Sequence, residues 1–113
     1  MSRSSTTTED AVAGVRLPPV HPGQVLREEF LLPFGLSADE LARECGLEPL
    51  ALEAIRDERA PIDAGIALRL GRYFGTSAEL WLGIQMQYDI ERTEDAMHDE
   101  IAKIRPRPLA AAE

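Results

Sequence analysis

The stretch from Leu36 to Ile62 constrains the fold most, because it carries start and stop signals for two short helices. Ser37 can cap the first helix, and Glu40, three residues later, can complete a capping box. Gly46 suits the left-handed residue that ends a helix. Pro49 fits the first position of the next helix, where a missing N–H costs nothing. The stretch therefore predicts two short helices joined by a tight turn.

The apolar residues of this stretch fall on one face of each predicted helix. Leu41, Ala42 and Cys45 share the inner face of the first helix, and Leu52 and Ile55 continue it on the second. A shared apolar face with a glycine in the turn is typical of a helix-turn-helix, whose second helix enters the major groove of DNA. Short amphipathic helix pairs also occur in other all-α proteins, so the pattern alone is only moderately specific.

The flanking sequence narrows the family through five short motifs that occur in order. They are His21-Pro22-Gly23, Leu36-Ser37, Ala67-Leu68-Arg69-Leu70, Tyr73-Phe74-Gly75-Thr76-Ser77 and Trp81-Leu82. With these motifs, the chain from about residue 20 to about residue 94 resembles the HigA-type antitoxins, a branch of the XRE (lambda-repressor-like) helix-turn-helix family. The resemblance implies an all-α fold, namely a five-helix lambda-repressor-like helix-turn-helix domain with an extended C-terminal helix.

The resemblance also implies a function, that of an antitoxin in a HigBA-type toxin–antitoxin module. Its partner would be a HigB-like toxin, a small basic ribonuclease that cuts translated mRNA and that the antitoxin binds and neutralises. The family further implies a homodimer that represses its own operon by binding operator DNA. Two alternatives stay open, a stand-alone XRE-type transcriptional regulator and a protein-interaction module that has lost DNA binding.

Length and composition favour a single domain in the cytoplasm. The chain has 113 residues, of which 44% are hydrophobic and 28% charged, as in ordinary globular domains. Its one cysteine cannot form an internal disulfide, which fits a reducing compartment. The N-terminal residues lack the apolar core of a signal peptide, and no apolar run approaches the about 20 residues of a membrane helix. We therefore expect no membrane segment.

The predicted boundaries divide the chain into three parts. Residues 1–19 are polar, rich in small residues and closed by Pro18 and Pro19, which indicates a disordered tail. The helix-turn-helix domain is expected at 20–94, and a C-terminal helix extension with a frayed tail at 95–113. Within the domain, the first helix is predicted from Pro22 to about Leu31, ended by Pro33 and Gly35.

The second half of the domain is predicted to contain one further short helix and one long one. Asp63 can cap the short helix, residues 64–74, and a left-handed glycine at position 75 can end it. Either Thr76 with Glu79, or Ser77, can cap the long helix. That helix is expected to continue until Pro106, because apolar residues recur at helical spacing up to there.

The apolar stripe on the long helix outruns a small core and predicts a dimer or partner contact. The alternative is that the stripe folds back onto its own domain. The candidate contact residues are Tyr88, Ile90, Met97, Ile101 and Ile104.

The contact surface for DNA is, by resemblance, the second helix of the motif, about residues 49–56, and the loop after it. The candidate DNA-binding residues are Arg27, Glu48, Leu50, Ala51, Glu53, Arg56 and Arg59. Several of these are unusual for DNA contacts, because apolar and acidic residues stand where the family carries polar or basic ones. Asp57-Glu58 also replaces the usual Asn-Gly turn.

Charge leaves two hypotheses about DNA. The net charge is −8, and residues 37–58 carry seven acids against two bases. DNA binding draws much of its strength from basic groups that neutralise phosphates. One hypothesis is therefore a helix-turn-helix kept as a scaffold, with weak or lost DNA binding and a basic protein partner. The other is that arginines supply the phosphate contacts and a dimer adds the rest. These arginines are Arg27, Arg56, Arg59, Arg69 and Arg72.

Enzyme chemistry has little support in this sequence. His21 and His98, with Cys45, are too few and too scattered for a zinc site, and no phosphate-binding loop or nucleophile motif appears. His21 is better explained as a helix-starting residue, and Cys45 as a buried structural thiol. We expect no catalytic residue, no metal and no cofactor.

Overall fold

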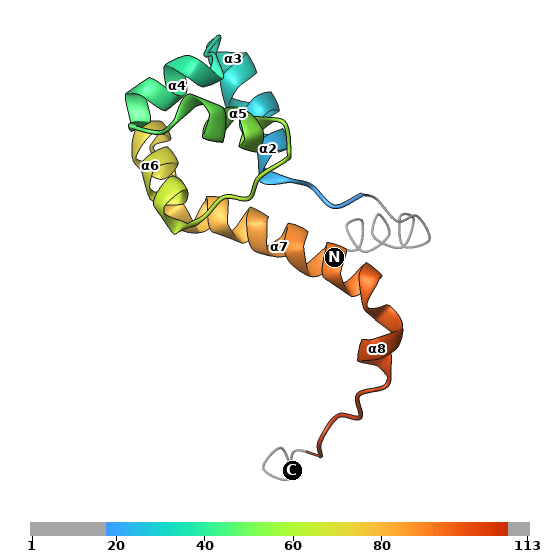
Figure 1. Ribbon diagram of the computed structural model, residues 1–113. Helices are drawn as coiled ribbons and strands as arrows, with labels where there is room; N and C mark the ends of the chain where they lie inside the picture. Colours follow the sequence, from blue (N-terminus) through green and yellow to red (C-terminus); the bar gives the residue numbers. More distant parts are fainter. Residues whose placement is uncertain (1–17, 109–113) are drawn as a thin grey trace, which may run out of the picture.

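The computed structural model describes residues 18–108, which are all-α as predicted and contain no strand (Figure 1). The elements are α2 (Pro22–Val25), η1 (Leu26–Leu31), α3 (Leu32–Phe34), α4 (Ala38–Cys45), α5 (Pro49–Arg56), α6 (Ala64–Phe74), α7 (Ala78–Ala96) and α8 (His98–Ala102). Most of the predicted N-terminal tail, residues 1–17, and the end of the predicted frayed tail, residues 109–113, lie outside the described residues.

The first helix is longer than predicted, because Pro33 does not end it. α2, η1 and α3 form one continuous helical segment that ends only at Gly35, which is left-handed with φ 60°. η1 is a π-helical turn, in which the N–H of Leu32 bonds to the carbonyl of Arg27, five residues back. A proline lacks the N–H and clashes with the carbonyl four residues before it in a regular helix. The widened turn just before Pro33 shifts that ladder and lets the helix continue.

The predicted caps of the later helices are confirmed. Ser37 accepts from the N–H of Glu40, whose carboxylate accepts in return from the N–H of Ser37, so the capping box is complete. Asp63 caps α6, and Ser77, not Thr76, caps α7. Gly46 and Gly75 are both left-handed at the ends of α4 and α6, with φ 69° and 76°. These caps explain why the bounds of α4 and α6 agree with the predicted ones, whereas α5 begins at Pro49, the predicted first position.

The core forms where the two helices of the motif meet the first helix, α6 and the start of α7. Its largest fully buried side chains are Trp81, Leu26, Leu41, Leu52, Ile55 and Leu70. The indole N–H of Trp81 donates to the hydroxyl of Thr76 at 3.0 Å, so the one polar atom of this side chain is satisfied. Phe30 and Phe74 lie beside the indole, with ring centroids 5.1 and 6.4 Å away.

The predicted long helix is interrupted, which corrects the expectation of one helix reaching Pro106. α7 ends at Ala96, Met97 has φ −114° and ψ 20°, and the short α8 follows. Acids at a helix C-terminus oppose the helix dipole, whereas acids in a first turn complement it. The break places Asp99 and Glu100 in the first turn of α8, which this dipole favours, whereas it leaves Glu94 and Asp95 in the less favourable last turn of α7.

The apolar stripe beyond the core does not fold back onto its own domain. α7 runs past the rest of the molecule and carries α8 away from it (Figure 1). Ile90, Met97, Ile101 and Ile104 are each at least 40% exposed. Tyr88, the candidate nearest the core, does contact its own domain, because its ring centroid lies 4.7 Å from that of His21. For the four residues beyond it, the intramolecular alternative is not what the described residues show, and a contact with another chain stays a prediction.

Candidate nucleic-acid interface

The second helix of the motif, α5, presents its N-terminal half to solvent. Leu52 and Ile55 are 0% and 1% exposed and anchor the inner face against the core, whereas Leu50 on the outer face is 76% exposed. Ala51 is also exposed, and Glu53 is half-buried. In a helix-turn-helix the N-terminal residues of this helix contact base edges. Leu50 and Ala51 offer apolar contacts there, and Glu53 offers hydrogen-bond acceptors.

The start of α5 is electrostatically different from a phosphate-binding helix end. Glu48 occupies the N-cap position, and its side chain makes no capping hydrogen bond. The exposed carboxylate lies beside the partial positive charge of the helix N-terminus, which it partly neutralises. A helix N-terminus otherwise attracts phosphate. The chain has thus placed an acid at the point of α5 where an anion would be expected to bind.

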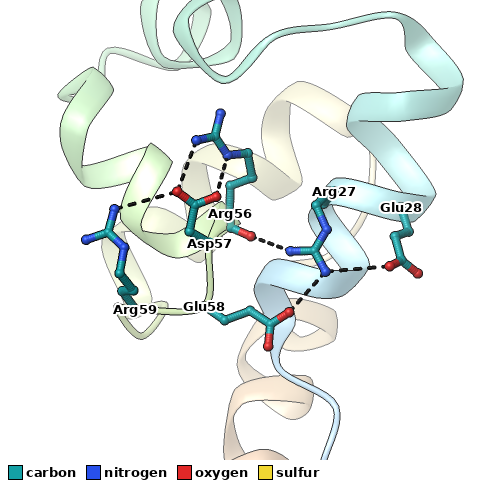
Figure 2. Close-up of polar contacts among 6 residues, drawn as sticks. All are labelled: Arg27, Glu28, Arg56, Asp57, Glu58 and Arg59. Atoms are coloured by element: carbon teal, nitrogen blue, oxygen red, sulfur yellow. Dashed lines mark hydrogen bonds and ion pairs between the residues drawn. The ribbon is translucent and has the colours of Figure 1, made fainter.

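The end of α5 carries the basic groups, and they are held by acids. The Arg56 guanidinium donates to both carboxylate oxygens of Asp57, from Nε at 2.8 Å and from an Nη at 3.1 Å (Figure 2). Arg59 approaches the same carboxylate at 3.6 Å from the other side. The hydrogen bonds from Arg56 are the main cause that lowers the pKa of Asp57, and the same bonds raise the pKa of Arg56. Asp57 is therefore ionised and shared by two guanidinium groups.

Arg27, from the first helix, reaches across to the same corner. Its Nη1 donates to the backbone carbonyl of Arg56 at 2.6 Å, and its Nη2 lies 3.0 Å from Glu58 and 3.5 Å from Glu28 (Figure 2). The carbonyl of Arg56 is the last of α5, so Arg27 satisfies an acceptor that the helix itself leaves unpaired. This arginine fixes the position of α5 on the domain.

A close backbone contact supports the same junction one turn earlier. A Cβ placed on Gly23 of α2 would lie 1.8 Å from the carbonyl oxygen of Ile55 in α5, so only glycine permits the observed approach. His21 starts α2 as predicted, because its Nδ1 accepts from the N–H of Gly23 at 2.8 Å. His21 is 4% exposed, and this burial lowers its pKa. Residues 21–27 thus fasten the C-terminal end of α5.

The turn after α5 has a left-handed residue that is not glycine. Glu58 has φ 65°, its N–H donates to the carbonyl of Ile55 at 2.9 Å, and the N–H of Arg59 donates to that of Ala54 at 2.7 Å. These two bonds form a Schellman motif, in which glycine is usual at the left-handed position. A side chain in this conformation costs about 1 to 2 kcal/mol. The Glu58 carboxylate gains the contact with Arg27 in return.

Comparison with known proteins identifies the family of this chain. No family model matches the chain. Virulence-associated protein I of Dichelobacter nodosus is 46% identical over 69% of this chain and 72% of its own length. The Pseudomonas aeruginosa antitoxin HigA, solved with the higBA promoter, has a TM-score of 0.77 and 38% identity, covering 80% of this chain and 99% of that one. The antitoxin GraA, solved in complex with its operator, has a TM-score of 0.76 and 38% identity, covering 82% and 94%. The chain belongs to the HigA-type antitoxins of the XRE helix-turn-helix family.

In this HigA-type antitoxin, three of the predicted DNA-binding residues lie together and the others lie apart. Arg27, Arg56 and Arg59 converge at the C-terminal end of α5 (Figure 2). The remaining candidates lie at its N-cap, Glu48, and along its first five residues, Leu50, Ala51 and Glu53. The interface is therefore divided into an apolar and acidic part that faces outward and a basic part that is already paired with carboxylates.

Arg69, a candidate phosphate contact by sequence, has a structural role in this antitoxin that the sequence does not reveal. Its Nη1 donates to the carbonyl of Cys45, the last residue of α4, at 2.6 Å, and lies 3.4 Å from the carbonyl of Gly46. Arg69 thus closes the end of α4, as Arg27 closes the end of α5. A basic residue is a known partner for terminal carbonyls. The partners are 24 residues apart, so no local pattern identifies the pair.

The described residues include neither a candidate metal site nor a candidate membrane-spanning helix. Within residues 18–108, no group of three or more histidine, cysteine or acidic side chains is placed to hold a metal ion. None of the helices in that range combines the length and the apolar character needed to cross a membrane. Cys45 is buried, and burial raises the pKa of its thiol, which agrees with the structural role predicted for it.

Proposed function

We propose that this protein is the antitoxin of a toxin–antitoxin pair and represses its own operon by binding operator DNA through α4 and α5. The observation that supports the proposal most is that its helix-turn-helix superposes on antitoxins solved with promoter or operator DNA, at 38% identity and over about four fifths of the chain. The helix pair itself is complete, since α4 has a full capping box, α5 begins at Pro49, and both helices pack on the core.

The proposed contact with bases uses the outward residues at the start of α5. Leu50 and Ala51 can contact the methyl group of thymine, and Glu53 can accept a hydrogen bond from the N4 amino group of cytosine. Neither Leu nor Ala can donate to a base or a phosphate. We therefore expect sequence readout that depends on thymine methyl groups and only a few phosphate contacts.

Binding to the protein's own upstream DNA, titrated against salt, tests this function. Each neutralised phosphate contributes about −0.9 to the slope of log K against log salt, so a shallow slope is expected. Leu50→Asp should weaken binding about tenfold or more, because it replaces a methyl contact with a charge that phosphates repel. Leu68→Asp is the matched control, since Leu68 is 64% exposed on α6 rather than on α5. Equal retention of the upstream DNA and an unrelated duplex would refute operator recognition.

The proposed toxin is a small basic ribonuclease of the HigB kind. The net charge of −8 suits a basic partner, because opposite charges steer the encounter of two proteins. The acidic outer face of the helix-turn-helix and the acidic end of α7 with α8 are both candidate surfaces. Mixing the protein with the basic protein encoded beside it should restore translation in an extract that the toxin has arrested.

The salt dependence of this association tests the steering argument separately. The association rate should fall strongly as ionic strength rises, because the Debye length shortens to about 8 Å at 0.15 M salt. A rate that does not change with salt would contradict steering, although the proteins could still bind. If no small basic protein is encoded beside this one, the stand-alone regulator is favoured. The absence of both toxin neutralisation and operator recognition would favour a protein-interaction module.

The proposed homodimer uses the exposed stripe of α7 and α8. Ile101 is 43% exposed and lies in α8, outside the packed domain. Ile101→Asp should convert a dimer to a monomer in light scattering, whereas Lys103→Asp, which changes an exposed residue outside the stripe, should not. An unchanged mass for Ile101→Asp would place the interface elsewhere.

A further inference from the structure

The arginines at the end of α5 form an anion site that the protein fills with its own carboxylate. Asp57 accepts two hydrogen bonds from Arg56, at 2.8 and 3.1 Å, and lies 3.6 Å from Arg59 (Figure 2). A planar guanidinium binds a carboxylate and a phosphate with the same bidentate geometry. The oxygens of Asp57 thus occupy the places that two oxygens of a phosphate diester would take between these arginines.

The inference rests on the proposed function, in which α5 contacts DNA and the site lies at its C-terminal end. Asp57 directly follows α5, at the start of the loop that leads to α6. Arg27 is occupied in the same way, because Glu58 and the carbonyl of Arg56 hold its two terminal nitrogens. Every arginine side chain of this corner is therefore engaged with an acceptor of the protein itself.

We propose that Asp57 masks a phosphate-binding site formed by Arg56 and Arg59, and so holds the affinity of this antitoxin for DNA low. A DNA phosphate that approaches these arginines must displace the carboxylate and is repelled by it. The masking is reversible, because both arginines and Asp57 are at least one third exposed and their pairs form at the surface. Surface ion pairs contribute little to stability, so the pairs can break at small cost when a stronger anion competes.

The expected size of the effect follows from counterion release. One additional phosphate contact changes the salt slope by about −0.9, which multiplies the affinity at 0.1 M salt about eightfold relative to 1 M salt. Asp57→Asn removes the carboxylate charge and keeps the size of the side chain. The variant should bind DNA about tenfold more tightly at 0.1 M salt, with a salt slope steeper by about 1. The gain should appear on operator and unrelated DNA alike, because phosphates carry no sequence.

The matched control is Glu100→Gln, which changes the net charge by the same amount at α8, the helix farthest along the chain from α5 (Figure 1). The control variant should alter neither the affinity nor the salt slope appreciably, because exposed charges separated by more than a Debye length are screened. In a second background, Arg56→Gln with Arg59→Gln, the change at Asp57 should lose its benefit, because the masked groups are gone. Equal melting temperatures of all variants confirm that folding is not the cause.

The outcomes separate the masking from the proposed function. Tighter binding and a steeper slope for Asp57→Asn, abolished in the double-arginine background, support the masked site even where wild type shows no preference for its upstream DNA. That lack of preference would count against operator recognition only. If Asp57→Asn changes affinity no more than Glu100→Gln does, or if the gain survives without both arginines, Asp57 masks nothing and the inference is wrong.

Discussion

Gly23 lies outside α5, but its replacement should displace α5, because the two backbones are in close contact. A Cβ at this position would lie 1.8 Å from the carbonyl oxygen of Ile55, whereas real Cβ atoms essentially never come closer than 3.0 Å to such an atom. Gly23→Ala therefore requires α2 and α5 to separate by about 1.2 Å, the difference between these distances. The atom that it meets is backbone, so no side-chain rotation relieves the clash.

The magnitude can be worked out from two opposing terms. Alanine is favoured over glycine by up to about 1 kcal/mol within a helix. Overpacking in a tight site costs about 1 to 3 kcal/mol, and here it also strains the Arg27 bond to α5. We expect Gly23→Ala to lower the free energy of unfolding by about 2 kcal/mol, with a fall in melting temperature of about 8 to 16 °C for a domain of this size.

Gly83 provides the matched control, because it lies inside α7 and a Cβ there would meet nothing within 4 Å. Gly83→Ala should raise the free energy of unfolding by about 0.5 to 1 kcal/mol. Urea unfolding of the three proteins, followed by circular dichroism, measures both changes. If Gly23→Ala is as stable as wild type, the close approach of α2 to α5 is not required and the reasoning fails.

Three further predictions concern the same corner. Arg27→Met should lower the free energy of unfolding by about 1 to 2 kcal/mol in urea, because the last carbonyl of α5 loses a charged donor, whereas the exposed Arg72→Met should change it little. Glu58→Gly should be about 1 kcal/mol more stable than Glu58→Ala in thermal unfolding, reversing the usual order, since φ is 65° there; equal stabilities would contradict this. Burial lowers the pKa of His21 below its ordinary 6.5, so the folded state disfavours the proton, and stability should be greatest above pH 6.5 and be lost as pH falls through the lowered pKa. His21→Asn keeps a capping acceptor and should remove that part of the pH slope, and an unchanged slope would assign it to other groups.

Local signals in the sequence were enough to predict α4, α6 and the start of α7. Ser37, Asp63 and Ser77 cap through their own side chains and the backbone three residues on, so the pattern and its physical cause lie within one turn. Gly46 and Gly75 end helices for an equally local reason, their positive φ. These interactions need no tertiary structure, and all of them could be read from neighbouring residues.

The parts that sequence reasoning missed depend on residues far apart in the chain or on weak local preferences. The roles of Arg27 and Arg69 arise from carbonyls 29 and 24 residues away. Gln85 is 7% exposed, and its side-chain amide oxygen accepts from the backbone N–H of Ile62, a contact that a helical apolar pattern cannot indicate. The break at Met97 is not marked by a proline or glycine, and only the two acids that it places in the first turn of α8 favour it.

The burial of Trp81 gives this protein an optical reporter of its own folding. It is the single tryptophan of the chain, it is 0% exposed, and its indole N–H is held by Thr76. Its fluorescence should shift to longer wavelength when water reaches the indole on unfolding, whereas a ligand bound to the outer face of α5 does not touch it. The melting temperature recorded by this emission should rise with increasing DNA concentration, because a ligand that binds only the folded state stabilises it. This rise would thus yield a dissociation constant with no dye or label attached.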